Sequence, residues 1–205
     1  METNGHYFDQ EPISTQLEGA VQLSLPDFSA TFVTASNVFS WKKLDTGTKF
    51  LLLNVPKPEA PPKNVLDLGC GYGPIAAVME HRFPSAKVWG IDVNRRAIEL
   101  AKSNTRSEET VICAPDEVPE DIAFDLIWSN PPIRIGKENL KMVLTRWLGR
   151  LHLSGVAYLV INKNLGADSI QKWLENESWE TSRLKSLKGY RLLEVKHHVL
   201  TSRSL

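Results

Sequence analysis

Three glycines at alternating positions stand between an apolar strand pattern and a helix start. The strand pattern is Val65–Leu68, the glycines are Gly69, Gly71 and Gly73, and Pro74 opens the helix pattern. Proline is favourable in the first helical turn because its missing N–H group would have no partner there. Glycines let the backbone turn sharply and let a ligand touch the main chain. The pattern predicts a strand, a ligand-binding loop and a helix in succession.

Strand and helix patterns alternate along the chain around this loop. Apolar strand patterns cover residues 65–68, 87–92, 110–113, 124–129 and 156–161, and helix patterns begin at 74 and cover 94–104, 137–150 and 169–174. Such alternation gives right-handed crossovers and a parallel sheet with helices on both faces. Two strands at 179–187 and 190–197, joined by a tight turn at Lys188-Gly189, would add an antiparallel strand at one edge. We expect an α/β fold with a Rossmann-like, seven-stranded, mostly parallel sheet.

A smaller segment precedes this sheet. Residues 1–16 are polar without a period, and we expect them to form a flexible N-terminus. Residues 17–62 predict a β-hairpin with a turn at Pro26-Asp27, a short capped helix at 45–54 and a proline-rich linker. The main domain then covers residues 63–205.

Composition excludes several classes of protein. Apolar residues are 42% and charged residues 23% of the 205, as a folded chain requires. No apolar run approaches the roughly 20 residues that span a bilayer, and the first six residues lack the pattern of a secretory signal. Two cysteines, Cys70 and Cys113, exclude a disulfide scaffold and a four-cysteine zinc site. We expect a cytoplasmic protein with neither membrane nor metal partner.

The net charge is zero, but the charges are unevenly distributed. Of 24 basic and 24 acidic residues, 13 and 6 lie in residues 134–205, which leaves 11 and 18 in residues 1–133. The balances are therefore +7 and −7. Two interpretations stay open, a basic surface that faces a polyanion and ordinary solvated helix faces.

Acidic residues lie at or near the carboxyl ends of three of the predicted strands. In open α/β sheets ligands bind at the carboxyl ends of the strands. Asp67 beside the glycines suits a cationic ligand and would repel a pyrophosphate. Asp92 could accept both hydroxyls of a ribose or could cap the following helix. Asp116 could receive an adenine amino group or be a simple loop residue.

The segment Asn130-Pro131-Pro132 follows the fourth strand directly. Two successive prolines fix the backbone and hold the asparagine side chain in one place. A rigid amide oxygen and a free prolyl carbonyl can grip an –NH₂ group. The segment therefore predicts a site for an amine substrate.

Taken together, these motifs resemble class I S-adenosylmethionine-dependent methyltransferases that act on an exocyclic amine. More closely, the chain resembles the small methyltransferase domain of the ribosomal-RNA guanine-N2 methyltransferases. Further matching stretches are Leu44-Asp45-x-Gly47-Thr48, Asn130 through Lys137, and Lys188 through Leu193. The resemblance covers roughly residues 17–196.

The resemblance implies a role for each matching position. Catalytic residues would be Asn130, Pro131 and Pro132. S-adenosylmethionine would be held by Asp67, Gly69, Gly71, Gly73, Asp92, Asp116, Phe39 and Thr48. Substrate would be held by Ile133, Arg134, Lys137, Tyr190 and Arg191. Related enzymes often have an aromatic residue where this chain has Ile133.

The function that the resemblance implies is methylation of an exocyclic amine of RNA, first of all N2 of guanine in ribosomal RNA. The protein would be a monomer or weak dimer, and its partner would be RNA or a ribosomal subunit. Alternatives are a DNA adenine or a protein glutamine amide as substrate, or an inactive RNA-binding factor of the same fold. A nicotinamide-dependent reductase is a rival that has no use for Asn130-Pro131-Pro132. The catalytic role of Asn130 predicts that Asn130→Ala stops methyl transfer and that Asn130→Asp is the milder change.

Overall fold

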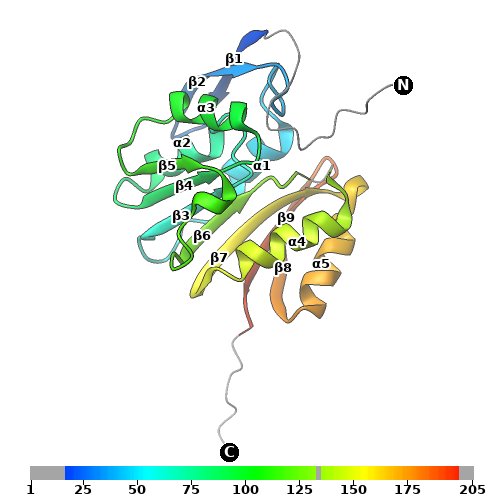
Figure 1. Ribbon diagram of the computed structural model, residues 1–205. Helices are drawn as coiled ribbons and strands as arrows, with labels where there is room; N and C mark the ends of the chain where they lie inside the picture. The colour runs from blue at the N-terminus through cyan, green and yellow to red at the C-terminus, as the bar shows by residue number, and fades with distance from the viewer. Residues whose placement is uncertain (1–16, 133–134, 199–205) are drawn as a thin grey trace, which may run out of the picture.

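The computed structural model describes residues 17–132 and 135–198, and its centre is one seven-stranded sheet (Figure 1). The strands are β3 (Asn64–Leu68), β4 (Lys87–Ile91), β5 (Thr110–Cys113), β6 (Phe124–Ser129), β7 (Leu151–Asn162), β8 (Trp179–Leu187) and β9 (Tyr190–His197). Their order across the sheet is β5-β4-β3-β6-β7-β9-β8. The first five run parallel, and β9 pairs antiparallel with both β7 and β8. The predicted fold class is confirmed.

The position of the antiparallel strand differs from the simplest expectation. It is β9, the last strand in the chain, and it lies between β7 and β8 rather than at the edge. Burial explains this order, because Leu192, Leu193 and Val195 of β9 are completely buried whereas most of β8 is exposed. The strand with the more apolar sequence therefore takes the inner place.

Helices cover both faces of the sheet. They are α1 (Thr46–Asn54), α2 (Pro74–Arg82), α3 (Arg95–Asn104), α4 (Lys137–Leu148) and α5 (Ala167–Asn176), with short 3₁₀ turns η1 (Pro115–Glu117) and η3 (Lys163–Leu165). One hydrophobic cluster joins α1, α2 and α3 to the sheet, and a second joins α4 and α5 to its other face. In Figure 1, α4 and α5 lie in front of β7, β9 and β8. Helix α4 ends two residues earlier than predicted, because Gly149 and Arg150 lead at once into β7.

The N-terminal hairpin, β1 (Glu18–Ser24) and β2 (Ser29–Ala35), forms a separate two-stranded sheet. Its buried residues Leu23 and Phe32 belong to the same hydrophobic cluster as α1, α2 and α3. The side chain of Asn104, at the end of α3, bonds the N–H and carbonyl of Val33 at 2.9 and 2.8 Å. The hairpin and the main sheet therefore share one hydrophobic core. The boundary predicted between residues 62 and 63 divides the sequence but does not separate two cores.

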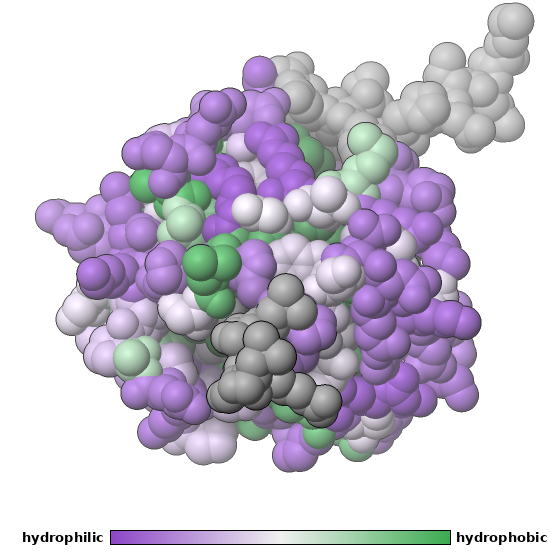
Figure 2. Space-filling view, turned by 90° about the horizontal axis from the view of Figure 1, so that it is seen from below, coloured by the Kyte–Doolittle hydropathy of each residue, from purple (hydrophilic) through white to green (hydrophobic). Residues whose placement is uncertain are grey.

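The two ends of the sheet differ in character. Figure 2 views the molecule from the end where β9 finishes, which is where the parallel strands begin, and this face is largely hydrophilic. The predicted site residues Asp92 and Asn130 follow strands at the opposite end. Within the described residues, no helix is long and apolar enough to cross a membrane, and no group of three potential metal ligands occurs.

Candidate active site

The loop between β3 and α2 turns through three residues in the left-handed region. The φ angles of Gly69, Gly71 and Gly73 are +79°, +55° and +90°, and other residues adopt such values only with strain. The N–H groups of Gly69 and Cys70 both donate to the carbonyl of Ile91, at 3.0 and 2.9 Å. A side chain added at Gly71 would meet no atom within 4 Å. The loop is therefore fixed to β4 on one side and open on the other.

Asp67 lies inside β3 and is completely buried. One carboxylate oxygen, Oδ2, accepts the N–H of Ala76 in the first turn of α2 at 2.9 Å. The other, Oδ1, is buried without a partner in the described structure. Burial raises the pKa of Asp67 well above its usual value, and the nearby Asp92 carboxylate raises it further. A buried acceptor that lacks a partner is costly, so this oxygen is suited to a donor or cation from outside the chain.

Asp92 follows β4 and adds a further contact between this strand and the glycine loop. Its Oδ2 accepts the N–H of Gly71 and its Oδ1 the N–H of Asn94, both at 2.9 Å. Each oxygen keeps a second lone pair for a further donor, as two ribose hydroxyls require. Burial raises the pKa of Asp92, while these backbone bonds oppose the shift. The capping residue of α3 is Asn94, which accepts the N–H of Arg96, so Asp92 is not the helix cap.

Asp116 occupies η1, beyond the end of β5, and its side chain is 89% exposed. One carboxylate oxygen forms an ion pair with Arg146 of α4 at 2.8 Å. Its proposed contact with adenine stays a prediction, and that contact would have to share the carboxylate with Arg146.

Asn130 follows β6 and is fixed by residues of the N-terminal segment. Its amide nitrogen donates to Oδ2 of Asp45 at 2.8 Å and to Oγ1 of Thr48 at 3.0 Å. Pro132 lies beside the glycine loop, with its Cδ 3.6 Å from the place of a Cβ on Gly69. Asn130-Pro131-Pro132 and the glycine loop are thus neighbours, as the sequence motifs predict.

Asp45 is a residue of the candidate site that the sequence motifs do not assign to it. It caps α1 by accepting the N–H of Thr48 at 2.9 Å through the same oxygen that holds Asn130. The sequence marks it as a helix cap, but nothing in the pattern links position 45 to position 130. Thr48 is buried, and its hydroxyl contacts Asn130. The contact of Thr48 with the cofactor stays a prediction.

The remaining predicted residues are spread around the end of the sheet where the parallel strands finish. The ring of Tyr190 lies over Gly47, where an added Cβ would come within 2.7 Å of it, whereas Arg191 approaches Asp168 of α5 on the other face, with Nε 3.9 Å from Oδ1. Phe39 is about half exposed, and Lys137 is exposed at the start of α4. The positions of Ile133 and Arg134 fall outside the described residues.

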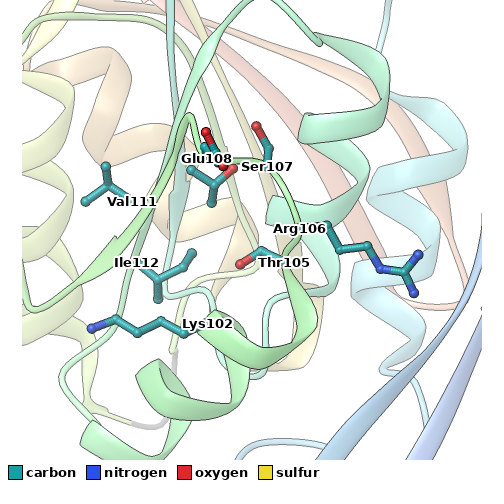
Figure 3. Close-up of a pocket in the computed structure, with 8 residues that line it drawn as sticks. Lys102, Thr105, Arg106, Ser107, Glu108, Val111 and Ile112 are labelled. Atoms are coloured by element: carbon teal, nitrogen blue, oxygen red, sulfur yellow. The ribbon is translucent and has the colours of Figure 1, made fainter.

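A hollow of the described surface lies away from these motifs. It has a volume of about 420 Å³ and is formed by the end of α3 and by β5, with lining residues that include Lys102, Ser107 and Thr110. In Figure 3 the guanidinium of Arg106 extends away from the other lining side chains. These groups do not converge on a common point, so this hollow is not the site that the motifs predict.

The seven-stranded fold and the match to a known family together show a methyltransferase that uses S-adenosylmethionine. The family model described as Methyltransferase small domain matches residues 29–194. The chain belongs to this family, and its cofactor is S-adenosylmethionine. The residues present fit this group, because Asp67 offers an unpartnered acceptor, Asp92 has spare lone pairs, and the space beside Gly71 is open.

Several proteins resemble this chain over most of its length. Uncharacterized protein YbxB of Bacillus subtilis (strain 168) is 33% identical over 199 residues, which cover 93% of this chain and 98% of that protein. Ribosomal RNA small subunit methyltransferase C of Shewanella amazonensis is 34% identical over 159 residues, 74% of this chain and 46% of that protein. The chain thus spans about half the length of that relative.

Among solved structures, a 16S rRNA N2 G1207 methyltransferase (RsmC) of T. thermophilus, in complex with AdoMet and guanosine, superposes with a TM-score of 0.75. It is 23% identical, and the match covers 91% of this chain and 52% of that one. A ribosomal protein L11 methylase of Lactobacillus delbrueckii superposes with a TM-score of 0.61 at 20% identity, over 76% of this chain and 83% of that chain. At these identities the superpositions establish the shared fold.

Proposed function

We propose that this protein transfers the methyl group of S-adenosylmethionine to an exocyclic amine of RNA, namely N2 of a guanine in ribosomal RNA. The observation that carries the proposal is the orientation of the Asn130 amide. Both of its N–H bonds are taken by Asp45 and Thr48, so its carbonyl oxygen is the group left to meet a substrate. An oxygen in that place accepts hydrogen bonds, and an amine donates them.

Methyl transfer depends more on the correct position of the amine and the methyl group than on general acid or base catalysis. When bound, S-adenosylmethionine supplies an activated methyl group on a sulfonium. Asn130 Oδ1 and the Pro131 carbonyl would accept the two N–H bonds of the amine, which turns the nitrogen lone pair out of the base ring. The Pro132 carbonyl is already used, because it accepts the N–H of Ile135 at 3.1 Å. Holding two reactants in attack geometry contributes on the order of 7–11 kcal/mol in the best intramolecular models.

The choice of RNA rests on the relatives and on charge. Relatives named for ribosomal RNA include the small subunit methyltransferase C and the large subunit methyltransferase G of Shewanella oneidensis, the latter 29% identical over 162 residues, 73% of this chain and 42% of that protein. The T. thermophilus structure contains guanosine. The basic balance of residues 134–205 suits a polyanion. These observations favour RNA over DNA adenine and over a protein amide.

The test is methyl transfer from labelled S-adenosylmethionine to ribosomal RNA, assembled ribosomal subunits, DNA and peptides, followed by mass analysis of the modified nucleoside. We expect N2-methylguanosine with RNA or subunits. The Asn130→Ala variant should lose about 10²–10³ in rate, as is typical when one preorganised polar group is removed, with nearly unchanged cofactor affinity. Methyladenine in DNA or methylglutamine in peptides as the main product would overturn the proposal.

The structure changes the expectation for Asn130→Asp. A carboxylate at position 130 would stand against Oδ2 of Asp45, which lies 2.8 Å from Asn130 Nδ2. Two carboxylates at that distance repel, and the amide donor is lost. We therefore expect Asn130→Asp to be as harmful as Asn130→Ala, in contrast to the expectation from sequence alone.

A further inference from the structure

The contact between Asp45 and Asn130 joins two segments that are 85 residues apart in the sequence. Asp45 stands at the start of α1, and Asn130 follows β6 at the centre of the main sheet. A single oxygen, Asp45 Oδ2, accepts both the N–H of Thr48 and the amide N–H of Asn130, at 2.9 and 2.8 Å. The bond that caps the helix thus holds the carboxylate in the place where it meets Asn130.

An asparagine amide can turn over and exchange its oxygen and nitrogen, so something must decide which end faces the substrate. An ionised carboxylate only accepts hydrogen bonds, whereas a threonine hydroxyl can donate or accept. If Asn130 turned over, its oxygen would face the Asp45 carboxylate and both bonds to its nitrogen would be lost. Thr48 could adapt to either orientation. Asp45 is therefore the residue that decides it.

We propose that Asp45 is a positioning residue that orients the Asn130 amide and thereby makes the site selective for a hydrogen-bond donor such as an amine. The proposal rests on the proposed function, because it assumes that Asn130 meets the substrate. With Asp45 present, the oxygen of Asn130 faces the substrate and excludes a keto group at the same place. Without it, the amide presents either end, and the site loses this selectivity.

Substitution of Asp45 separates positioning from helix capping. Asn, Asp and Ser are about equally good capping residues, so a residue that only caps tolerates all three. In Asp45→Asn the oxygen held by Thr48 N–H can still accept from Asn130. In Asp45→Ser the side chain is shorter, and its hydroxyl can donate as well as accept. We expect kcat to fall at least tenfold in Asp45→Ser and much less in Asp45→Asn.

The kinetic readout is kcat and KM for RNA with the full chain, together with cofactor affinity by calorimetry and the melting temperature. We expect the loss in Asp45→Ser to appear in kcat, with cofactor affinity and melting temperature near those of the wild type. Equal kcat in wild type, Asp45→Asn and Asp45→Ser would overturn the proposal. A parallel loss of cofactor affinity would do the same, because it would place Asp45 at the cofactor.

A second measurement needs no substrate. The side-chain N–H resonances of Asn130 can be assigned in ¹⁵N-labelled protein by their absence from Asn130→Ala. We expect their exchange with water to be slow in the wild type and at least tenfold faster in Asp45→Ser. Unchanged exchange would contradict the orienting role even if the enzyme proved inactive on RNA. Conversely, inactive wild-type protein with the expected exchange would refute the proposed function alone.

Discussion

Asp67 illustrates how a single buried charge can set both stability and binding. Its carboxylate is completely buried, and only one of its two oxygens has a partner, the N–H of Ala76 in α2. We expect Asp67→Asn to stabilise the fold at neutral pH and to weaken the binding of S-adenosylmethionine. Asparagine keeps an oxygen for the Ala76 N–H but carries no charge that must be buried. Equilibrium unfolding and calorimetry on the same preparations measure the two effects.

The sign of the pH dependence is set by the raised pKa of Asp67. The folded protein binds this proton more tightly than the unfolded chain does. The stabilisation of the folded state by this proton is therefore fully present below the ordinary pKa of 3.8, and it is lost as pH rises toward the higher pKa of the folded protein. A displacement of one pKa unit corresponds to about 1.4 kcal/mol. Wild type should therefore lose stability relative to Asp67→Asn as pH rises above 3.8. Parallel stability curves for the two proteins would contradict this.

Asp92 has two tasks, and its substitution must be interpreted with both in mind. Asp92→Ala should weaken cofactor binding, since hydrogen bonds to a charged group contribute roughly 1.5–3 kcal/mol each. It also frees the Gly71 N–H that Asp92 holds at 2.9 Å. Asp92→Asn, which keeps one acceptor oxygen, is the matched control. Calorimetry should rank wild type, Asn and Ala in order of falling affinity, and equal affinity in all three would remove Asp92 from the site.

At the residue scale the sequence predicts the side chains that stand directly after strands, and it misses contacts between distant segments. Asn130, Asp92 and the glycines are found from their places after apolar strands, because the carboxyl ends of parallel strands share one edge. Asp45 is different. Its cap on α1 is visible in the sequence, but its bond to Asn130 depends on how the N-terminal segment packs on the sheet. No periodicity encodes that packing.

At the scale of elements, helix α1 has little room at its start. A Cβ on Gly47 would lie 2.7 Å from the Tyr190 ring and 2.8 Å from the Asp45 carboxylate. Alanine is favoured over glycine in helices by roughly 0.5–1 kcal/mol, so propensity alone predicts a more stable protein. We expect Gly47→Ala to lower kcat at least several-fold, because the ring or the carboxylate must move.

Measured kcat together with the free energy of unfolding tests this conflict between propensity and packing. Gly166 provides a control, since an added Cβ there meets nothing within 4 Å, although its φ of +100° brings backbone strain. Gly166→Ala should lose stability with kcat retained. Wild-type kcat in Gly47→Ala would mean that Tyr190 and Asp45 have room to adjust.

The elements themselves are largely encoded locally, but their order in the sheet is not. The terminal hairpin is predicted at the residues where β8 and β9 occur, because its turn at Lys188-Gly189 has a strong local signal. Which of its strands joins β7 is decided by burial on both faces. The adjacent residues Leu192 and Leu193 of β9 show this burial, since one packs on each face of the sheet. An alternating pattern alone would not distinguish an inner strand from an edge strand.

At the scale of the whole molecule, the position of the basic side chains predicts which end of the sheet RNA approaches. Lys163, the first residue of η3 directly after β7, and Lys188, in the turn before β9, are both exposed at the end of the sheet that carries Asn130. The backbone brings them together, because the Lys163 N–H donates to the carbonyl of Gly189 at 2.6 Å. Lys57 and Lys63, also exposed, lie in the segment that leads into the start of β3, toward the opposite end.

We expect the double variant Lys163→Gln/Lys188→Gln to weaken RNA binding and to reduce its dependence on salt. Each phosphate contact adds about 0.7–0.9 to the slope of log affinity against log salt concentration. Loss of two contacts should therefore lower the slope by about 1.5 units and leave cofactor affinity unchanged. Lys57→Gln/Lys63→Gln removes the same charge near the other end and should leave the slope within about 0.3 of the wild-type value. Equal slopes for the two double variants would mean that only net charge matters, and that RNA does not approach the end of the sheet where β7 ends and β9 begins.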